Sequence, residues 1–138
     1  MPPNFNSLLR VASLPGLAIL KLVAWADRGA ANAMDAHDLY QLMTNYAAAG
    51  NSGRLYEAEF HVLEAAGYDP EIAGACLLGK DAARLSDRQT LARLLAILER
   101  THERLAVDLV KSIRHAQNAR ARVQARLEQF RAGLRMEE

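Results

Sequence analysis

The chain has 138 residues, of which 51% are hydrophobic and 24% charged, and its formal net charge is +1. This balance is that of one ordinary globular domain, and the small net charge excludes an overall electrostatic attraction to nucleic acid or membranes. The one cysteine, Cys76, excludes an intramolecular disulfide and a cysteine-rich metal site. We expect a cytoplasmic protein, because the N-terminal sequence has no signal-peptide pattern and the longest apolar stretch, 14–26, is too short to span a bilayer.

The first predicted helix spans residues 13–28. Ser13 is a typical N-cap, Pro15 is tolerated in the first turn, and Gly29 is a typical stop signal. Apolar residues cover every side of this segment, which predicts a central helix buried nearly all round. Lys21 interrupts the apolar surface, so we expect it to have a partner of opposite charge.

Two more helices are expected before residue 68. Apolar residues at helical spacing predict a second helix from near 32–35 to Gly50, followed by a turn at 51–53. A third helix should run from 54 to about 66 and end at Gly67. Its buried residues should be Leu55, Phe60 and Leu63.

A fourth helix should begin at Asp69-Pro70, with the aspartate as N-cap and the proline at the first helical position. It should bury Cys76 as a small core residue and continue past Gly79 toward Leu85. Small residues at 73–75 indicate a close approach to a neighbouring helix.

The C-terminal segment contains no glycine or proline from 87 to 132, and Ser86 with Gln89 resembles a capping box at its start. One unbroken helix of about 45 residues would be about 70 Å long, whereas a break near Thr101-His102 would give a helical hairpin. The sequence leaves both alternatives open. Its second half carries a coiled-coil type seam at positions 116, 120, 123, 127, 130 and 134.

These elements predict an all-α fold in which four shorter helices pack against a long C-terminal helix. We expect a helical domain over 1–100 and an amphipathic helical extension over 101–138. The arginines of this extension are expected on a solvated face, with binding to nucleic-acid phosphates left as an alternative. They are Arg114, Arg120, Arg122, Arg126, Arg131 and Arg135.

One charged cluster could carry chemistry: Lys21, Arg28, Asp35 and Asp38. The two cations are two helical turns apart and share a face, and the two aspartates are nearly one turn apart on the next helix. The cluster could be a pair of phosphate-binding cations held by acidic partners, or a structural ion-pair network. A second candidate, Gly79-Lys80-Asp81, lacks a glycine-rich loop, so we expect an exposed helical turn there.

Two stretches of the sequence resemble the helical region of the nucleotidyltransferase-like proteins of the AbiEii toxin group. The first combines Ser13-Leu14-Pro15 with Lys21-Leu-Val-Ala24-Trp25-Ala-Asp27-Arg28 and Asp35-Ala-His-Asp38-Leu39, and the second is Gly67-Tyr-Asp-Pro-Glu-Ile-Ala73-Gly-Ala-Cys-Leu77-Leu-Gly79-Lys80-Asp81. The resemblance covers about residues 8–100. It implies that Lys21 and Arg28 face the phosphates of a nucleotide, while Asp35 and Asp38 orient them or assist the chemistry.

The sequence departs from this family in two ways. Met34 stands where the family usually has a basic residue before the first aspartate. The Gly-Ser turn and the Asp-x-Asp of the family's metal-binding half are also absent, and nucleotidyl transfer needs such carboxylates to hold magnesium. We therefore expect no complete catalytic set and no metal site, with magnesium and nucleotide binding only in a complete parent enzyme.

The expected function is that of a helical C-terminal domain that forms one wall of a nucleotide cleft and is not catalytic alone. The chain would then be a fragment of a longer enzyme or a natural remnant, and its partner would be the missing nucleotidyltransferase half or an antitoxin. The alternative is a non-enzymatic module that forms a homo-oligomer, or binds a protein partner, through residues 105–134.

Overall fold

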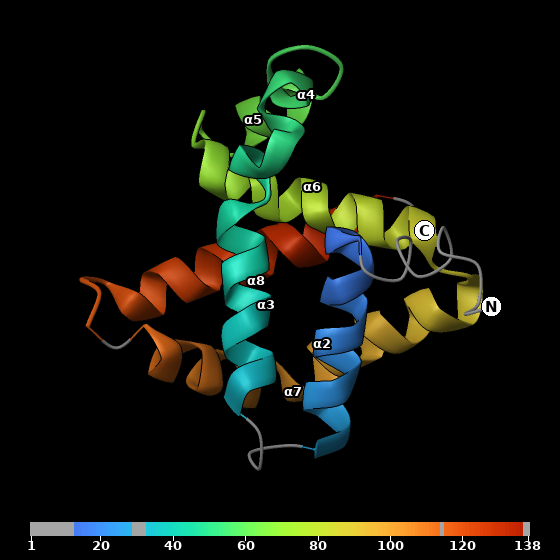
Figure 1. The fold of residues 1–138 in the computed structure, drawn as a ribbon, viewed down its shortest axis with the longest axis vertical. Coiled ribbons are helices and arrows are strands. Elements are labelled where there is room, and N and C mark those ends of the chain that lie inside the picture. The colour runs from blue at the N-terminus through green and yellow to red at the C-terminus, as the bar shows by residue number, and fades with distance from the viewer. Residues whose placement is uncertain (1–12, 29–32, 114, 137–138) are drawn as a thin grey trace, which may run out of the picture.

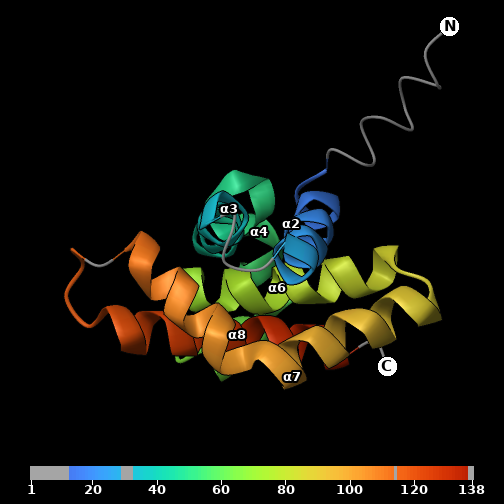
Figure 2. The same ribbon diagram turned by 90° about the horizontal axis from the view of Figure 1, so that it is seen from below.

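The structure is a computed structural model that describes residues 13–28, 33–113 and 115–136. It confirms the all-α class, since every regular element in these residues is helical. Helices α2 and α3 lie side by side and cross α6, α7 and α8 (Figure 1). Figure 2 shows that α2 and α3 form one layer and that α6, α7 and α8 lie beneath it. The bounds are α2 Leu14–Arg28, α3 Ala33–Asn45, the π-helical turn η2 Ala47–Asn51, α4 Ser52–Tyr56, α5 Phe60–Ala65, α6 Pro70–Leu85, α7 Arg88–Ser112 and α8 Ala119–Arg135.

Helix α2 begins as the sequence predicts, because the hydroxyl of Ser13 accepts a hydrogen bond from the backbone N–H of Gly16. The expectation that α2 is buried nearly all round is wrong. Leu22 and Trp25 are fully buried on the side that faces the core, whereas Leu20 is 48% exposed. The helix lies in the outer layer, beside α3 and above α6 and α7, so its remaining surface faces solvent.

The region between α3 and α6 differs from its prediction. Helix α3 ends at Asn45 rather than at the predicted Gly50, which has φ of 91° within η2. The predicted turn at 51–53 is helical instead, since residue 51 ends η2 and residues 52–53 begin α4. The single helix expected over 54–66 is wrong, because the chain leaves α4 after Tyr56 and enters α5 at Phe60. Leu55 and Leu63 are buried as predicted, but Phe60 is exposed and contacts Tyr68 at the surface.

Helix α6 is the centre of the fold and contacts α2, α3 and α8. The carboxylate of Asp69 caps its N-terminus by accepting from the backbone N–H groups of Glu71 and Ile72, with Pro70 at the first position as predicted. All residues from 73 to 80 are buried. The close approach predicted from small residues occurs at Gly74, which lies against the backbone of Ala47.

The C-terminal segment is a helical hairpin, so the single long helix in the predicted fold class is wrong. The reversal lies between Ile113 and Asn118, where Asn118 adopts a left-handed conformation with φ of 57°. Thr101, the position considered for a break, only kinks α7. The predicted capping box is displaced by one residue, because Asp87 rather than Ser86 caps α7 by accepting from the N–H of Thr90.

The seam of α8 is buried within the chain. Four of its five apolar members, Val123, Leu127, Phe130 and Leu134, are 0–1% exposed in a helix that contacts α6 and α7. The fifth, Ala116, precedes α8 and is partly buried, and Arg120 is exposed. One hydrophobic core contains residues from both sides of position 100. Among the described residues, no helix is both long enough and apolar enough to cross a membrane.

Candidate functional site

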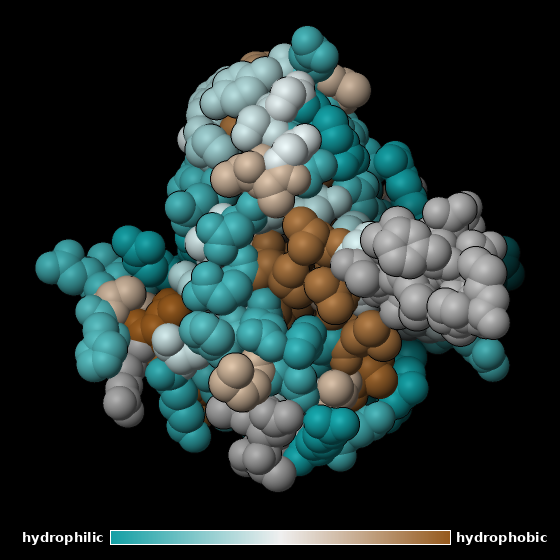
Figure 3. Space-filling model, in the orientation of Figure 1, coloured by the Kyte–Doolittle hydropathy of each residue, from teal (hydrophilic) through white to brown (hydrophobic). Residues whose placement is uncertain are grey.

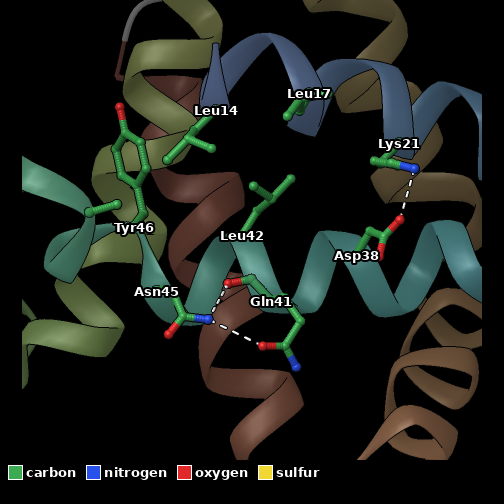
Figure 4. A pocket seen from close by; sticks show the side chains of 9 residues that line it. Leu14, Leu17, Lys21, Asp38, Gln41, Leu42, Asn45 and Tyr46 are labelled. Carbon is green, nitrogen blue, oxygen red and sulfur yellow. Dashed lines mark hydrogen bonds and ion pairs between the residues drawn. The ribbon is translucent and has the colours of Figure 1, made fainter. Parts of the chain in front are cut away.

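The structure brings three of the four predicted cluster residues together. The Lys21 ammonium nitrogen lies 2.8 Å from Asp38 Oδ2 and 3.5 Å from Asp35 Oδ1, so α2 and α3 are linked by one cation and two carboxylates. This arrangement follows from the packing of the two helices, because Lys21 projects toward α3 and Asp38 projects back toward it (Figure 4). Asp35, one turn earlier in α3, reaches the same ammonium group. The expectation that Lys21 has acidic partners is confirmed.

Arg28 does not join this cluster. Its side chain is exposed at the end of α2, and it forms no ion pair with either aspartate. Lys21 and Arg28 are seven residues apart and therefore lie on one side of α2. Of the two, only Lys21 forms ion pairs with the aspartates of α3. The predicted pair of phosphate-facing cations is therefore reduced to one cation in contact with the acidic residues.

Asp35 is the most enclosed member of the cluster. It is 5% exposed, and its Oδ2 atom is buried without a hydrogen-bond partner. A buried carboxylate is costly unless it is paired, and here the compensation comes from Lys21 and from the position of Asp35 in the first turn of α3. The unused oxygen leaves Asp35 able to accept one more hydrogen bond.

The contacts also fix the charge of Lys21. Its hydrogen bond to Asp38 raises the pKa of the ammonium group above its usual value, against an opposing effect of burial, and the negative charge of Asp35 adds to the increase. Lys21 therefore remains protonated throughout the neutral range. About a third of its side chain is exposed, so solvent or a ligand can reach it.

An open groove lies beside the cluster, between α2 and α3, with a volume of about 450 Å³. Figure 4 shows Leu14 and Leu17 of α2 opposite Leu42 of α3, with Lys21 and Asp38 at one end. The hydropathy surface of this side of the molecule has an apolar area in the middle of the face (Figure 3). A groove with apolar walls and a few polar groups is typical of a small-molecule site.

Sequence reasoning missed a second polar region, on α6. The exposed helical turn expected at Gly79-Lys80-Asp81 is wrong, because Lys80 is 8% exposed and its ammonium group donates to both oxygens of buried Glu59, at 2.6 and 2.9 Å. The sequence did contain a signal for a buried ion pair here, because Lys80 interrupts an apolar helix as Lys21 does. It could not identify Glu59, which lies 21 residues earlier, outside any regular helix.

Asp81 forms the other half of this region. Arg54 donates two hydrogen bonds to its carboxylate, at 2.8 and 2.9 Å, and the hydroxyl of Tyr46 donates a third. Burial would raise the pKa of Asp81, but the hydrogen bonds from Arg54 and Tyr46 outweigh it and hold the pKa below its usual value. These contacts fix α4 and the residue that follows α3 onto α6.

Two buried polar residues of the C-terminal hairpin, Arg126 and Asp108, form hydrogen bonds with other helices. Arg126 is 3% exposed and donates to Thr44 and Glu71, so the expectation that it is solvated is wrong. Arg120 and Arg122 are exposed as expected, and Arg114 lies outside the described residues. The indole N–H of Trp25 donates to buried Asp108, at 2.8 Å. These bonds tie α8 to α3 and α6, and α7 to α2.

Cys76 and the other possible metal ligands of the described residues do not form a reactive site. Cys76 is buried as predicted, and burial raises the pKa of its thiol to about 11, so it is protonated at neutral pH. A search of the described ranges finds no set of three His, Cys, Asp or Glu side chains placed to hold a metal ion. The Lys21 cluster and its groove are thus the best candidate site.

Comparison with known proteins adds no assignment, because no family model, curated protein or solved structure matches this chain.

Proposed function

We propose that this chain is a helical domain of a nucleotidyltransferase-like protein and forms one wall of its nucleotide cleft without catalysing the reaction alone. The observation that carries the proposal is the placement of Lys21 between Asp35 and Asp38 at the edge of the groove between α2 and α3. The resemblance of residues 8–100 to the AbiEii group implies a role for these three residues and for Arg28, which lies outside the cluster.

The chemistry of Lys21 suits a phosphate contact. An ammonium group has three donors, and two of them are directed at Asp35 and Asp38. The side chain is about a third exposed and stays protonated throughout the neutral range, so a ligand can reach the ammonium group. Lysine binds phosphate as a point charge, and here the two carboxylates fix the position of that charge.

The charges also explain why this domain would need the metal-binding half of the protein to bind a nucleotide well. Two carboxylates and one ammonium give the cluster a net negative charge, so it does not attract a free phosphate strongly. A nucleotide whose phosphates are neutralised by magnesium meets less repulsion. Asp35 and Asp38 do not fit the role of magnesium ligands, because both carboxylates are directed at Lys21. The metal-binding carboxylates would belong to the other half of the protein.

Calorimetric titration with Mg-ATP and Mg-GTP tests this proposal on the wild type and on Lys21→Ala. We expect weak wild-type binding that is lost in Lys21→Ala and retained in a control variant, Lys111→Ala. Lys111 is a suitable control because it is an exposed lysine on α7 outside the groove. Circular dichroism establishes that each variant is folded.

The opposite result is also informative. If the wild type binds neither nucleotide, and Lys21→Ala only lowers the unfolding temperature, the cluster is a structural ion-pair network and the proposal fails. Self-association through residues 105–134 has less support, because the apolar residues Val123, Leu127, Phe130 and Leu134 of α8 are already buried within the chain. Sedimentation at high concentration would test that alternative directly.

A further inference from the structure

We infer that the groove between α2 and α3 receives the base of the nucleotide whose phosphates contact Lys21. This inference rests on the proposed function and extends it from a phosphate contact to recognition of the nucleoside. It uses residues that neither the charged cluster nor the sequence motifs include: Leu17, Leu42, Gln41 and Asn45.

The size and walls of the groove suit an aromatic ring. Its volume of about 450 Å³ lies within the range of about 300–1,000 Å³ that is typical of small-molecule pockets. Leu14 and Leu17 line it from α2, and Leu42 faces them from α3 (Figure 4). All three side chains are only partly buried, so a planar base inserted between the helices would cover apolar surface that is now in water.

The groove also offers hydrogen-bonding groups suited to the edge of a base. The Asn45 amide donates to the backbone carbonyl of Gln41 at 2.9 Å and to its side-chain oxygen at 3.2 Å. This leaves the Asn45 carbonyl as an acceptor and the Gln41 amide as a donor, with no partner among the described residues. Tyr46 adds no further donor, because its hydroxyl is bonded to Asp81.

The order of these groups along α3 matches that of a nucleotide. Asp38, beside Lys21, and Asn45 are separated by two helical turns, which is about 10 Å at 1.5 Å per residue. The charged end of the groove and its amide end are therefore separated by about the length of a nucleotide. The apolar walls lie between them, where the base and ribose would be placed.

Calorimetry with the full chain separates base recognition from phosphate recognition. The ligands are the magnesium complexes of ATP, GTP, CTP and UTP, compared with magnesium tripolyphosphate, which has no base. We expect at least one nucleotide to bind about tenfold or more tightly than tripolyphosphate, because its base would remove the apolar surface of the leucine walls from water. Leu17→Trp should fill the groove and remove this preference, while binding of tripolyphosphate should be unchanged.

Leu85→Gln is the matched control, because Leu85 is an exposed leucine of α6 that does not line this groove. It should leave the affinities for the nucleotides and for tripolyphosphate unchanged. Asn45→Ala provides a second variant if Leu17→Trp fails to fold, since Asn45 is exposed, and it should change the preference among the four bases.

If tripolyphosphate and all four nucleotides bind equally, and neither groove variant changes their binding, the inference that the groove receives the base is wrong. The proposed phosphate contact would survive that result as long as Lys21→Ala abolishes binding. Absence of binding by every ligand would refute the proposed function itself, and the base site with it.

Discussion

Gly79 of α6 and Gly133 of α8 lie at the same helix crossing, each against the backbone of the other's helix. A Cβ atom at Gly79 would lie 2.1 Å from the carbonyl oxygen of Phe130, and one at Gly133 would lie 1.9 Å from that of Cys76. Contacts this short cannot be relieved by a side-chain rotation, because both obstacles are backbone atoms. The two glycines therefore permit the packing that buries the apolar face of α8.

Gly79→Ala and Gly133→Ala should each lower the free energy of unfolding by about 3 kcal/mol or more, the upper part of the range for overpacked cores. Urea unfolding followed by circular dichroism measures the change. Gly53→Ala is the control, since Gly53 lies in α4 with open space around its Cα. It should be neutral or slightly stabilising, because alanine is the better helix former. Wild-type stability in Gly79→Ala would mean that the helices do not cross at this distance.

The buried pair of Lys80 and Glu59 should behave differently from an exposed pair. Lys80→Met leaves the Glu59 carboxylate buried without its partner, and breaking such a pair costs about 3–5 kcal/mol. Lys80→Met with Glu59→Leu should regain most of that loss, because no uncompensated charge remains. Arg93→Met removes the exposed pair with Asp27 and should cost less than about 1 kcal/mol. Equal effects of Lys80→Met and Arg93→Met on unfolding would contradict the burial seen here.

Acid should destabilise the protein partly through Asp81. Its pKa is lower in the folded chain than the ordinary value of 3.8, so near that pH the unfolded chain binds the proton more readily. The contribution of Asp81 to stability is thus fully present above pH 3.8 and is lost as the pH falls through the folded pKa. Asp81→Asn should make urea stability less sensitive to pH between about 5 and 3. Asp27→Asn is the matched control for the substitution itself, because it removes a carboxylate from an exposed pair.

Cys76 should be inert in the folded protein. Its thiol is buried, and burial raises its pKa to about 11, so almost none is the reactive thiolate at pH 8. Alkylation by iodoacetamide should be slow in buffer and fast in concentrated urea, as measured by mass spectrometry. Rapid modification under native conditions would show that the surface around Cys76 opens readily.

The contribution of Cys76 to stability has the opposite pH dependence to that of Asp81. The folded pKa is raised, so this contribution is present below the pKa of the unfolded thiol and is lost as the pH rises toward about 11. Cys76→Ala should remove that alkaline loss, although the smaller side chain is expected to lower stability at neutral pH by leaving unfilled space in the core.

The sequence by itself determined the features that depend on neighbours in the chain. Ser13 and Asp69 cap the helices that follow them because a capping side chain bonds to backbone groups two or three residues away. The apolar spacing of Val123, Leu127, Phe130 and Leu134 likewise identified the buried side of α8. Lys21 was recognised as a residue in need of a partner, and Asp35 and Asp38 lay close enough in the sequence to be proposed.

Only the tertiary structure decided the features that join distant segments. The chain reverses between α7 and α8 beside Asn118, which has a left-handed backbone conformation. No glycine or proline near this position indicates a turn in the sequence. Lys80 bonds to Glu59, which is 21 residues away in the sequence, and Arg126 bonds to Thr44, which is 82 residues away. Periodicity shows which side of a helix is apolar, but it does not say which helix covers that side or which charge lies opposite. Those partners depend on how the helices pack together, and this also decided that Lys21, and not Arg28, lies beside the groove.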